Sequence, residues 1–266
     1  MEKILAQLLD LDGQVAIVTG GAQGIGKGIS TVLASAGAHV FIADKNTKEA
    51  EKTATELGGN GAKVSTVAVD LSDESSIRNM VKEVATRAKR LDILVNNAAI
   101  YPFCPIREMS TDVWDKTLAV DLRAPFLTTR YSAEQMITDK IRGRIVNISS
   151  INTYKTYVGM AHYDSSKGGI EALTKSAALE YAPFGITANA VAPGGVKTPG
   201  SLKIRERFAQ GGDVEKADTE MEKKIPLGRW ARPEEIGYAV WYFCSAVGEY
   251  VTGQVIYVDG GMKLGL

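Results

Sequence analysis

A tyrosine and a lysine four positions apart, Tyr163 and Lys167, are the residues of this sequence best suited to acid–base chemistry. Of the ten tyrosines only Tyr163 has a lysine at this spacing, which places two side chains one turn apart on one face of a helix. At about 4 Å and an effective dielectric constant of about 20, the ammonium would stabilise the phenolate by roughly 4 kcal/mol. Before desolvation losses, that attraction would lower the pKa of the phenol by about 3, towards neutrality, where proton transfer is most effective.

Ser150 lies thirteen residues before Tyr163, at the end of an apolar, strand-like run. A serine hydroxyl beside a reacting oxygen stabilises the negative charge that develops there. Ser149 competes for this role, but the spacing to Tyr163 favours Ser150. The three residues suit the removal of a hydroxyl proton while hydride leaves the carbon that bears it.

A glycine-rich turn at 19–26 joins an apolar run to a helical pattern, as in sites where backbone and helix N-terminus meet a pyrophosphate. Asp44 ends the next apolar run, 18 residues beyond Gly26, where a carboxylate can accept hydrogen bonds from both ribose hydroxyls. The same carboxylate would repel a 2′-phosphate, and Gln23 leaves the turn without a basic residue. We therefore expect NAD rather than NADP, although Lys45 stands beside Asp44.

The elements that position these groups alternate along the chain. This alternation predicts the α/β class: a single-domain, Rossmann-type, doubly wound parallel sheet over 1–266, with about seven strands and helices on both faces. Apolar runs predict strands at 15–18, 40–43, 64–69, 93–95, 145–148, 186–191 and 255–258. Helical patterns cover about 24–36, 46–57, 73–89, 110–138, 163–181 and 233–245.

Composition excludes several classes of partner. Basic and acidic residues number 31 each, so nothing attracts the chain to nucleic acid or to an anionic membrane, and we expect a small-molecule substrate. No apolar run reaches the roughly 18 residues of a membrane span, and residues 1–11 lack a signal-peptide pattern, so we expect a cytoplasmic protein. Two distant cysteines and two histidines predict no metal site.

Six motifs follow one another between about residue 13 and residue 262: Thr19-Gly20-x-x-x-Gly24-x-Gly26, Asn96-Asn97-Ala98, Ser150, Tyr163-x-x-x-Lys167, Pro193-Gly194 and Asp259-Gly260-Gly261. Together, and in this order, they resemble the short-chain dehydrogenase/reductase family. The resemblance implies hydride transfer between a secondary alcohol and a ketone with NAD(P), in a homotetramer. It implies one interface through 110–138 and 163–181, and another through the last strand and Met262.

The resemblance also implies residue roles. Tyr163 would be the general acid/base, Ser150 the hydrogen-bond donor to the substrate oxygen, and Lys167 the residue that binds the nicotinamide ribose and lowers the pKa of Tyr163. The implied cofactor contacts are Gly20, Gln23, Gly24, Ile25, Gly26, Asp44, Asp70, Leu71, Asn97, Ala98, Tyr163, Lys167, Pro193, Gly194, Val196 and Thr198.

Two positions depart from the family pattern. Ala99 stands where the family usually has glycine, and Asp121 stands where it usually has its fourth catalytic residue, an asparagine. If the residue at this position acts only through its backbone carbonyl, aspartate can replace asparagine. A carboxylate near Lys167 would instead favour the ammonium while weakening its net pull on Tyr163. We expect activity to survive with a basic pH optimum.

Aromatic residues point to a hydrophobic or cyclic substrate rather than a polyhydroxy sugar. The predicted substrate pocket contains Tyr101, Phe103, Asn152 and Tyr157, with Tyr154 and Trp230 as further candidates. The charge-rich stretch 199–225 interrupts the alternation and follows the cofactor loop. It is either a solvated loop or, as we favour, a mobile helical lid or insertion over the substrate.

Three other functions compete with an NAD-dependent alcohol dehydrogenase. An NADP-preferring carbonyl reductase differs only in the cofactor. A dehalogenase-like lyase on the same scaffold would abandon the dinucleotide site, against which the intact glycines and Asp44 argue. A non-catalytic dinucleotide-binding protein would not need the complete set of Ser150, Tyr163 and Lys167.

Overall fold

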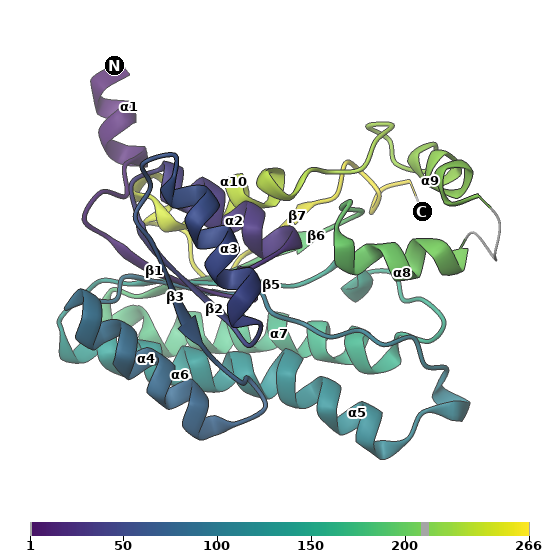
Figure 1. Ribbon diagram of the computed structural model, residues 1–266, viewed down its shortest axis with the longest axis horizontal. Coiled ribbons are helices and arrows are strands. Elements are labelled where there is room, and N and C mark those ends of the chain that lie inside the picture. The colour runs from purple at the N-terminus through teal and green to yellow at the C-terminus, as the bar shows by residue number, and fades with distance from the viewer. Residues whose placement is uncertain (1, 209–212, 266) are drawn as a thin grey trace.

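The computed structural model describes residues 2–208 and 213–265. Its described strands form one seven-stranded, entirely parallel sheet in the order β3-β2-β1-β4-β5-β6-β7 (Figure 1). The predicted fold class is confirmed. The strands are β1 Val15–Thr19, β2 His39–Asp44, β3 Val64–Ala68, β4 Ile93–Asn96, β5 Arg144–Ile148, β6 Thr187–Pro193 and β7 Val255–Val258.

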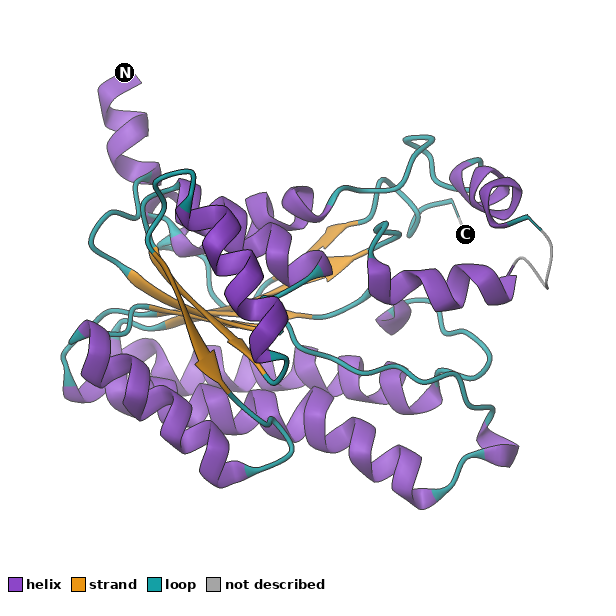
Figure 2. Cartoon of the chain, in the orientation of Figure 1, coloured by secondary structure: helices purple, strands orange, loops and turns teal. Residues whose placement is uncertain are grey.

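Helices cover both faces of this sheet (Figure 2). α2, α3 and α10 lie over one face, α4, α6 and α7 lie over the other, and α1 projects from the body (Figure 1). The helices are α1 Glu2–Leu9, α2 Gly24–Ser35, α3 Thr47–Gly58, α4 Glu74–Ala88, α5 Thr111–Leu118, α6 Ala124–Thr138, α7 Ala161–Tyr181, α8 Pro199–Phe208, α9 Val214–Glu222 and α10 Pro233–Cys244. Among the described residues, no helix is both long and apolar enough to cross a membrane.

The strand order reverses direction beside β1. The chain runs from β1 outward to β2 and β3, and then returns to β4 on the other side of β1. The loops after β1 and β4 therefore diverge, which leaves a crevice at the carboxyl ends of these strands, the usual place for a ligand in such sheets. Every residue of β1 and of β4 is buried, because helices cover both faces at this point.

The segment 110–138 is helical over residues 111–138, as the sequence pattern predicted, but it is not α-helical throughout. A π-helical turn at Ala119–Arg123 separates α5 from α6. This turn carries Asp121, whose side chain is fully buried and accepts a hydrogen bond from the backbone N–H of Ile100 at 2.8 Å. A π turn inserts an extra residue into a helix and commonly occurs at functional sites. The turn thus brings a carboxylate inside the protein.

The stretch 199–225 contains helices α8 and α9, as a helical lid requires. The Nε atom of Arg205 in α8 donates to the Oδ1 atom of Asp218 in α9 at 2.7 Å, and the two side chains form a salt bridge. The part of the predicted lid at 209–212 lies outside the described residues. The ion pair joins the two helices beside the crevice.

Candidate active site

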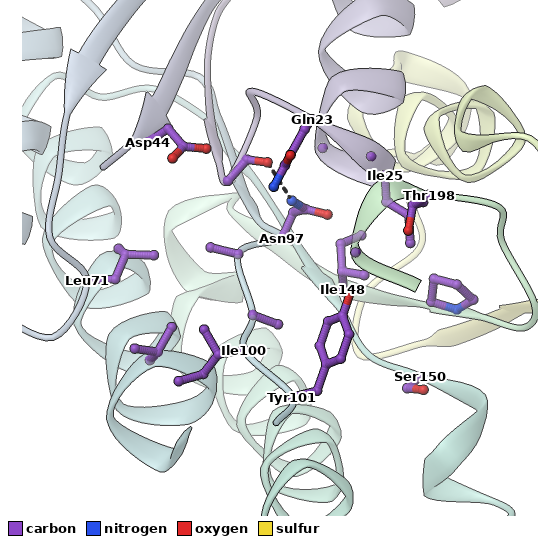
Figure 3. Close-up of a pocket in the computed structure, with 18 of the residues that line it drawn as sticks. Gln23, Ile25, Asp44, Leu71, Asn97, Ile100, Tyr101, Ile148, Ser150 and Thr198 are labelled. Atoms are coloured by element: carbon purple, nitrogen blue, oxygen red, sulfur yellow. Dashed lines mark hydrogen bonds between the residues drawn. The ribbon is translucent and has the colours of Figure 1, made fainter. Parts of the chain in front are cut away.

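Two adjoining cavities open at the carboxyl ends of the strands. The first has a volume of about 400 Å³ and follows the glycine turn and the ends of β1, β2 and β4 (Figure 3). The second has a volume of about 530 Å³ and lies towards α8 and α9. The residues that line both cavities are Ile25, Tyr101, Ser150, Tyr163, Gly194 and Thr198.

The glycine turn is shaped to let a ligand approach its backbone. Gly20 and Gly24 have φ angles of +62° and +55°, which only glycine adopts readily. A Cβ atom on Gly26 would lie 2.1 Å from the carbonyl oxygen of Gly20. Gln23 precedes α2 without a side-chain cap, so the first N–H groups of this helix remain available to an anion. This donor set fits a dinucleotide pyrophosphate.

Asn97 holds the turn in place from the neighbouring strand. Its Nδ2 atom donates to the carbonyl oxygen of Thr19 at 2.9 Å and to that of Gly20 at 3.2 Å. The bond with Gly20 is the dashed line beside Asn97 in Figure 3. All predicted cofactor residues except Val196 line the first cavity. Val196 is buried and lines the second cavity instead. Lys45 also lines the first cavity, next to Asp44.

Ser150, Tyr163 and Lys167, predicted from spacing alone, come together between the two cavities. The Nζ atom of Lys167 lies 5.4 Å from the ring centre of Tyr163 and donates to the carbonyl oxygen of Ile148 at 2.8 Å. Ser150 and Tyr163 are within hydrogen-bonding reach of each other. The spacing of four on α7 therefore does place the lysine beside the phenol.

The expected lowering of the Tyr163 pKa is wrong for this structure. Burial raises the pKa of the phenol, a hydrogen bond with Ser150 lowers it, and the charge of Asp121 raises it further. Burial likewise lowers the pKa of Lys167, while Asp121 opposes that shift. The estimate from Coulomb's law stood before desolvation losses, and in this structure burial is the largest cause of the shift in the Tyr163 pKa.

Asp121 is the least ordinary group of the site. Burial raises the pKa of its carboxyl to about 7, against the opposing effects of Lys167 and of the Ile100 N–H. Its Oδ2 atom is buried and has no hydrogen-bond partner among the described residues. A carboxyl that titrates near neutrality, beside the lysine, is a candidate for control of the site's pH dependence.

We expect the Asp121→Asn substitution to lower the pH at which the phenol of Tyr163 loses its proton. Above pH 7 the charged carboxylate raises the pKa of Tyr163, so its removal should move the rise of the pH–rate profile down by about one pH unit. Below about pH 6 the carboxyl is neutral in the parent too, and the profiles should converge. Steady-state kcat/KM between pH 5 and 10 tests this, with exposed Asp115→Asn as the matched control. Superimposable profiles for Asp121→Asn and the parent would contradict it.

Glu171 was missed by the sequence analysis, although it continues the α7 face of Tyr163 and Lys167 by one more turn. Its Oε1 atom accepts hydrogen bonds from Ser149 Oγ at 3.0 Å and from Thr153 Oγ1 at 2.8 Å. Glu171 therefore anchors the loop on both sides of Ser150 by hydrogen bonds. The signal in the sequence was the spacing: Glu171 follows Lys167 by four residues, as Lys167 follows Tyr163.

The second cavity contains the predicted substrate residues. Tyr101, Phe103, Asn152 and Tyr157 all line it, and so does Trp230, in a wall that is mostly apolar. Tyr154 lines neither cavity; it is 55% exposed, and its ring lies 5.1 Å from the Nζ atom of Lys263. Arg205 is the only lysine or arginine that lines the cavity in the described parts of the chain, and Asp218 neutralises it.

Comparison with known proteins found a family model and relatives that match almost the whole chain. A family model described as enoyl-(acyl carrier protein) reductase matches residues 20–263. The 3-oxoacyl-acyl-carrier-protein reductase FabG of Aquifex aeolicus is 38% identical over 255 residues, 96% of this chain and 99% of that protein. The crystal structure of a short-chain type dehydrogenase/reductase from Mycobacterium marinum is 31% identical with a TM-score of 0.89, covering 96% of this chain and 98% of that one.

A further solved structure is a gluconate 5-dehydrogenase from Burkholderia cenocepacia J2315 in complex with NADP and tartrate. It is 30% identical with a TM-score of 0.90, covering 98% of this chain and 100% of that one. The family model and these relatives span almost the whole sequence, including both cavities. The chain belongs to the short-chain dehydrogenase/reductase family of oxidoreductases.

Proposed function

We propose that the protein interconverts a secondary alcohol and a ketone by hydride transfer with NAD, with Tyr163 as the general acid/base. The observation that carries this proposal is that Ser150 and Tyr163 line both cavities. A proton donor at this junction reaches a substrate oxygen in the second cavity while the carbon beside it faces the first. A lyase or a non-catalytic binding protein has no need for this placement.

The residues of the chain divide the work of the reaction. Ser150 donates a hydrogen bond to the substrate oxygen, and Tyr163 takes the hydroxyl proton during oxidation or returns it during reduction. The bound dinucleotide accepts or supplies the hydride. Lys167 holds positive charge below the phenol, and Glu171 fixes the loop that carries Ser150.

Asp44 supports a preference for NAD. It lines the first cavity at the end of β2, where a carboxylate accepts hydrogen bonds from ribose hydroxyls and repels a 2′-phosphate. Lys45 lines the same cavity and favours the alternative, an NADP-preferring carbonyl reductase. The complex of the Burkholderia relative contains NADP, which supports the same alternative.

The wall of the second cavity supports a hydrophobic or cyclic substrate. Phe103, Met160, Trp230 and Met262 contribute apolar surface, and Arg205, the single arginine among the described residues of this wall, is paired with Asp218. A sugar acid would leave its hydroxyls and carboxylate facing this surface with few partners. We propose that α8 and α9 act as a lid over this substrate.

A spectrophotometric screen tests the proposed function. Secondary alcohols grouped as rings, chains and sugars are offered with NAD⁺ or NADP⁺, and the corresponding ketones with NADH or NADPH. We expect turnover of cyclic alcohols, with kcat/KM for NAD⁺ about tenfold above that for NADP⁺ or more, and Asp44→Ser should reverse this preference. Dinucleotide binding without turnover of any alcohol or ketone would favour the non-catalytic alternative.

We also propose a homotetramer. Phe126 in α6 and Leu179 in α7 are 46% and 79% exposed, so both helices present apolar side chains to the surface, as an interface through them requires. Size-exclusion chromatography with light scattering should give the mass of four chains. A monomer at micromolar concentration would contradict this proposal.

A further inference from the structure

Asn152 lies close to the reacting groups and has no part in the proposed proton transfer. It follows Ser150 by two residues, in the short 3₁₀ turn Ile151–Thr153, and its backbone N–H donates to Ser150 Oγ at 3.1 Å. Its side chain is 9% exposed and lines the second cavity together with Ser150 and Tyr163. Any polar atom that it presents to the cavity is therefore near the substrate oxygen.

Asp164 determines which way the amide of Asn152 points. The Nδ2 atom of Asn152 donates to Asp164 Oδ1 at 2.7 Å, and Asp164 Oδ2 accepts from the backbone N–H of Tyr157 at 3.4 Å. Carboxylate oxygens accept hydrogen bonds, so the amide nitrogen has to face Asp164. The carbonyl oxygen of Asn152 then occupies the other arm of the amide.

The carbonyl oxygen of Asn152 has no hydrogen-bond partner among the described residues. It is not completely enclosed by protein atoms, unlike the Oδ2 atom of Asp121. It therefore keeps access to the cavity that its side chain lines. The surrounding wall is mainly apolar, with Phe103, Met160 and Trp230. An acceptor in such a wall loses hydration when a substrate binds, unless the substrate brings a donor.

We propose that Asn152 Oδ1 accepts a hydrogen bond from a hydroxyl or N–H group on the carbon next to the one that reacts. The preferred substrates are then vicinal diols, amino alcohols and the corresponding α-hydroxy or α-amino ketones on an otherwise apolar, cyclic frame. The neighbouring carbon is favoured because Asn152 is bonded through its own N–H to Ser150, which holds the reacting oxygen. This inference rests on the proposed function. Asp164 is a positioning residue that acts through Asn152.

The test compares three alcohols on one ring: a cycloalkanol, its vicinal diol and the monomethyl ether of that diol. The ether keeps the second oxygen but cannot donate from it. We expect the parent to prefer the diol over the ether by about tenfold or more in kcat/KM, since a site built around a hydrogen bond rejects an analogue that leaves it unpaired. The Asn152→Leu variant should lose this preference, to within about twofold.

Asp164→Asn is the matched variant, because it preserves shape and allows the Asn152 amide to turn its nitrogen towards the cavity. We expect it to lower the ratio of diol to ether, chiefly by improving KM for the ether, whose oxygen accepts. The ratio is independent of any change in the pKa of Tyr163, since both alcohols use the same base. NAD⁺ affinity, measured by protein fluorescence, reports whether each variant is folded.

The outcomes separate the inference from the function on which it rests. Equal use of diol and ether by the parent, or a preference that survives in both variants, overturns the role of Asn152 and leaves the dehydrogenase proposal intact. A parent that oxidises no alcohol and reduces no ketone overturns both. A preference for the diol that disappears with Asn152→Leu and weakens with Asp164→Asn supports the inference.

Discussion

Replacing Tyr163 with phenylalanine is expected to lower kcat for alcohol oxidation by about a thousandfold, the middle of the range for loss of a general acid/base. The ring would still fill its place between the two cavities, where it packs edge to face against Tyr101 with centroids 5.6 Å apart. NAD⁺ binding should therefore change little. Steady-state rates and fluorescence titration of NAD⁺ measure the two effects separately.

The control for this variant is Tyr154→Phe, which removes the same hydroxyl from an exposed tyrosine that lines neither cavity. It should keep the parent's rate within about twofold. If Tyr163→Phe retained a comparable rate, the assignment of the acid/base would be wrong. If it lost NAD⁺ binding as well as turnover, the residue would be structural rather than catalytic.

Adding a methyl group at Gly26 is expected to weaken dinucleotide binding about a hundredfold or more. The new Cβ would lie 2.1 Å from the carbonyl oxygen of Gly20 and 2.5 Å from Asn97 Nδ2, far inside contact distance. The turn would have to move away from the position that the Asn97 hydrogen bonds hold. Calorimetric titration of NAD⁺ into Gly26→Ala measures the loss.

Gly58→Ala is the matched control, since Gly58 also belongs to a helix but has nothing within 4 Å of its added Cβ. Alanine has the higher helix propensity, so this variant should bind NAD⁺ as the parent does and unfold at the same or a slightly higher temperature. Undiminished affinity in Gly26→Ala would show that the turn does not carry the dinucleotide.

The order of elements and most of the site followed from the sequence because both depend on local patterns. Buried strands of a parallel sheet appear as short apolar runs, and the positions of the glycine turn and Asp44 depend only on the strands that precede them. Tyr163 and Lys167 are one turn apart on a single helix, so their proximity required no tertiary information.

The remaining features depend on surroundings that the sequence does not display. The sign of the Tyr163 pKa shift is set by burial, which cannot be read from a spacing of four residues. The π turn at Ala119–Arg123 follows no hydrophobic period, and the orientation of Asn152 depends on Asp164, twelve positions away in a different element. The family resemblance implied a cofactor contact for Val196, which lines the second cavity rather than the first.

The small apolar cluster beside the second cavity can change its residues, and with them the substrate preference, at little cost to the stability of the fold. Ile151, Ile225 and Met262, with Trp230 packed against them, form a group of their own, apart from the two large clusters that sandwich the sheet. Substitutions there reshape the substrate wall without opening holes next to the strands, where they would be most costly. Directed evolution towards new alcohols should therefore find tolerated changes in this cluster first.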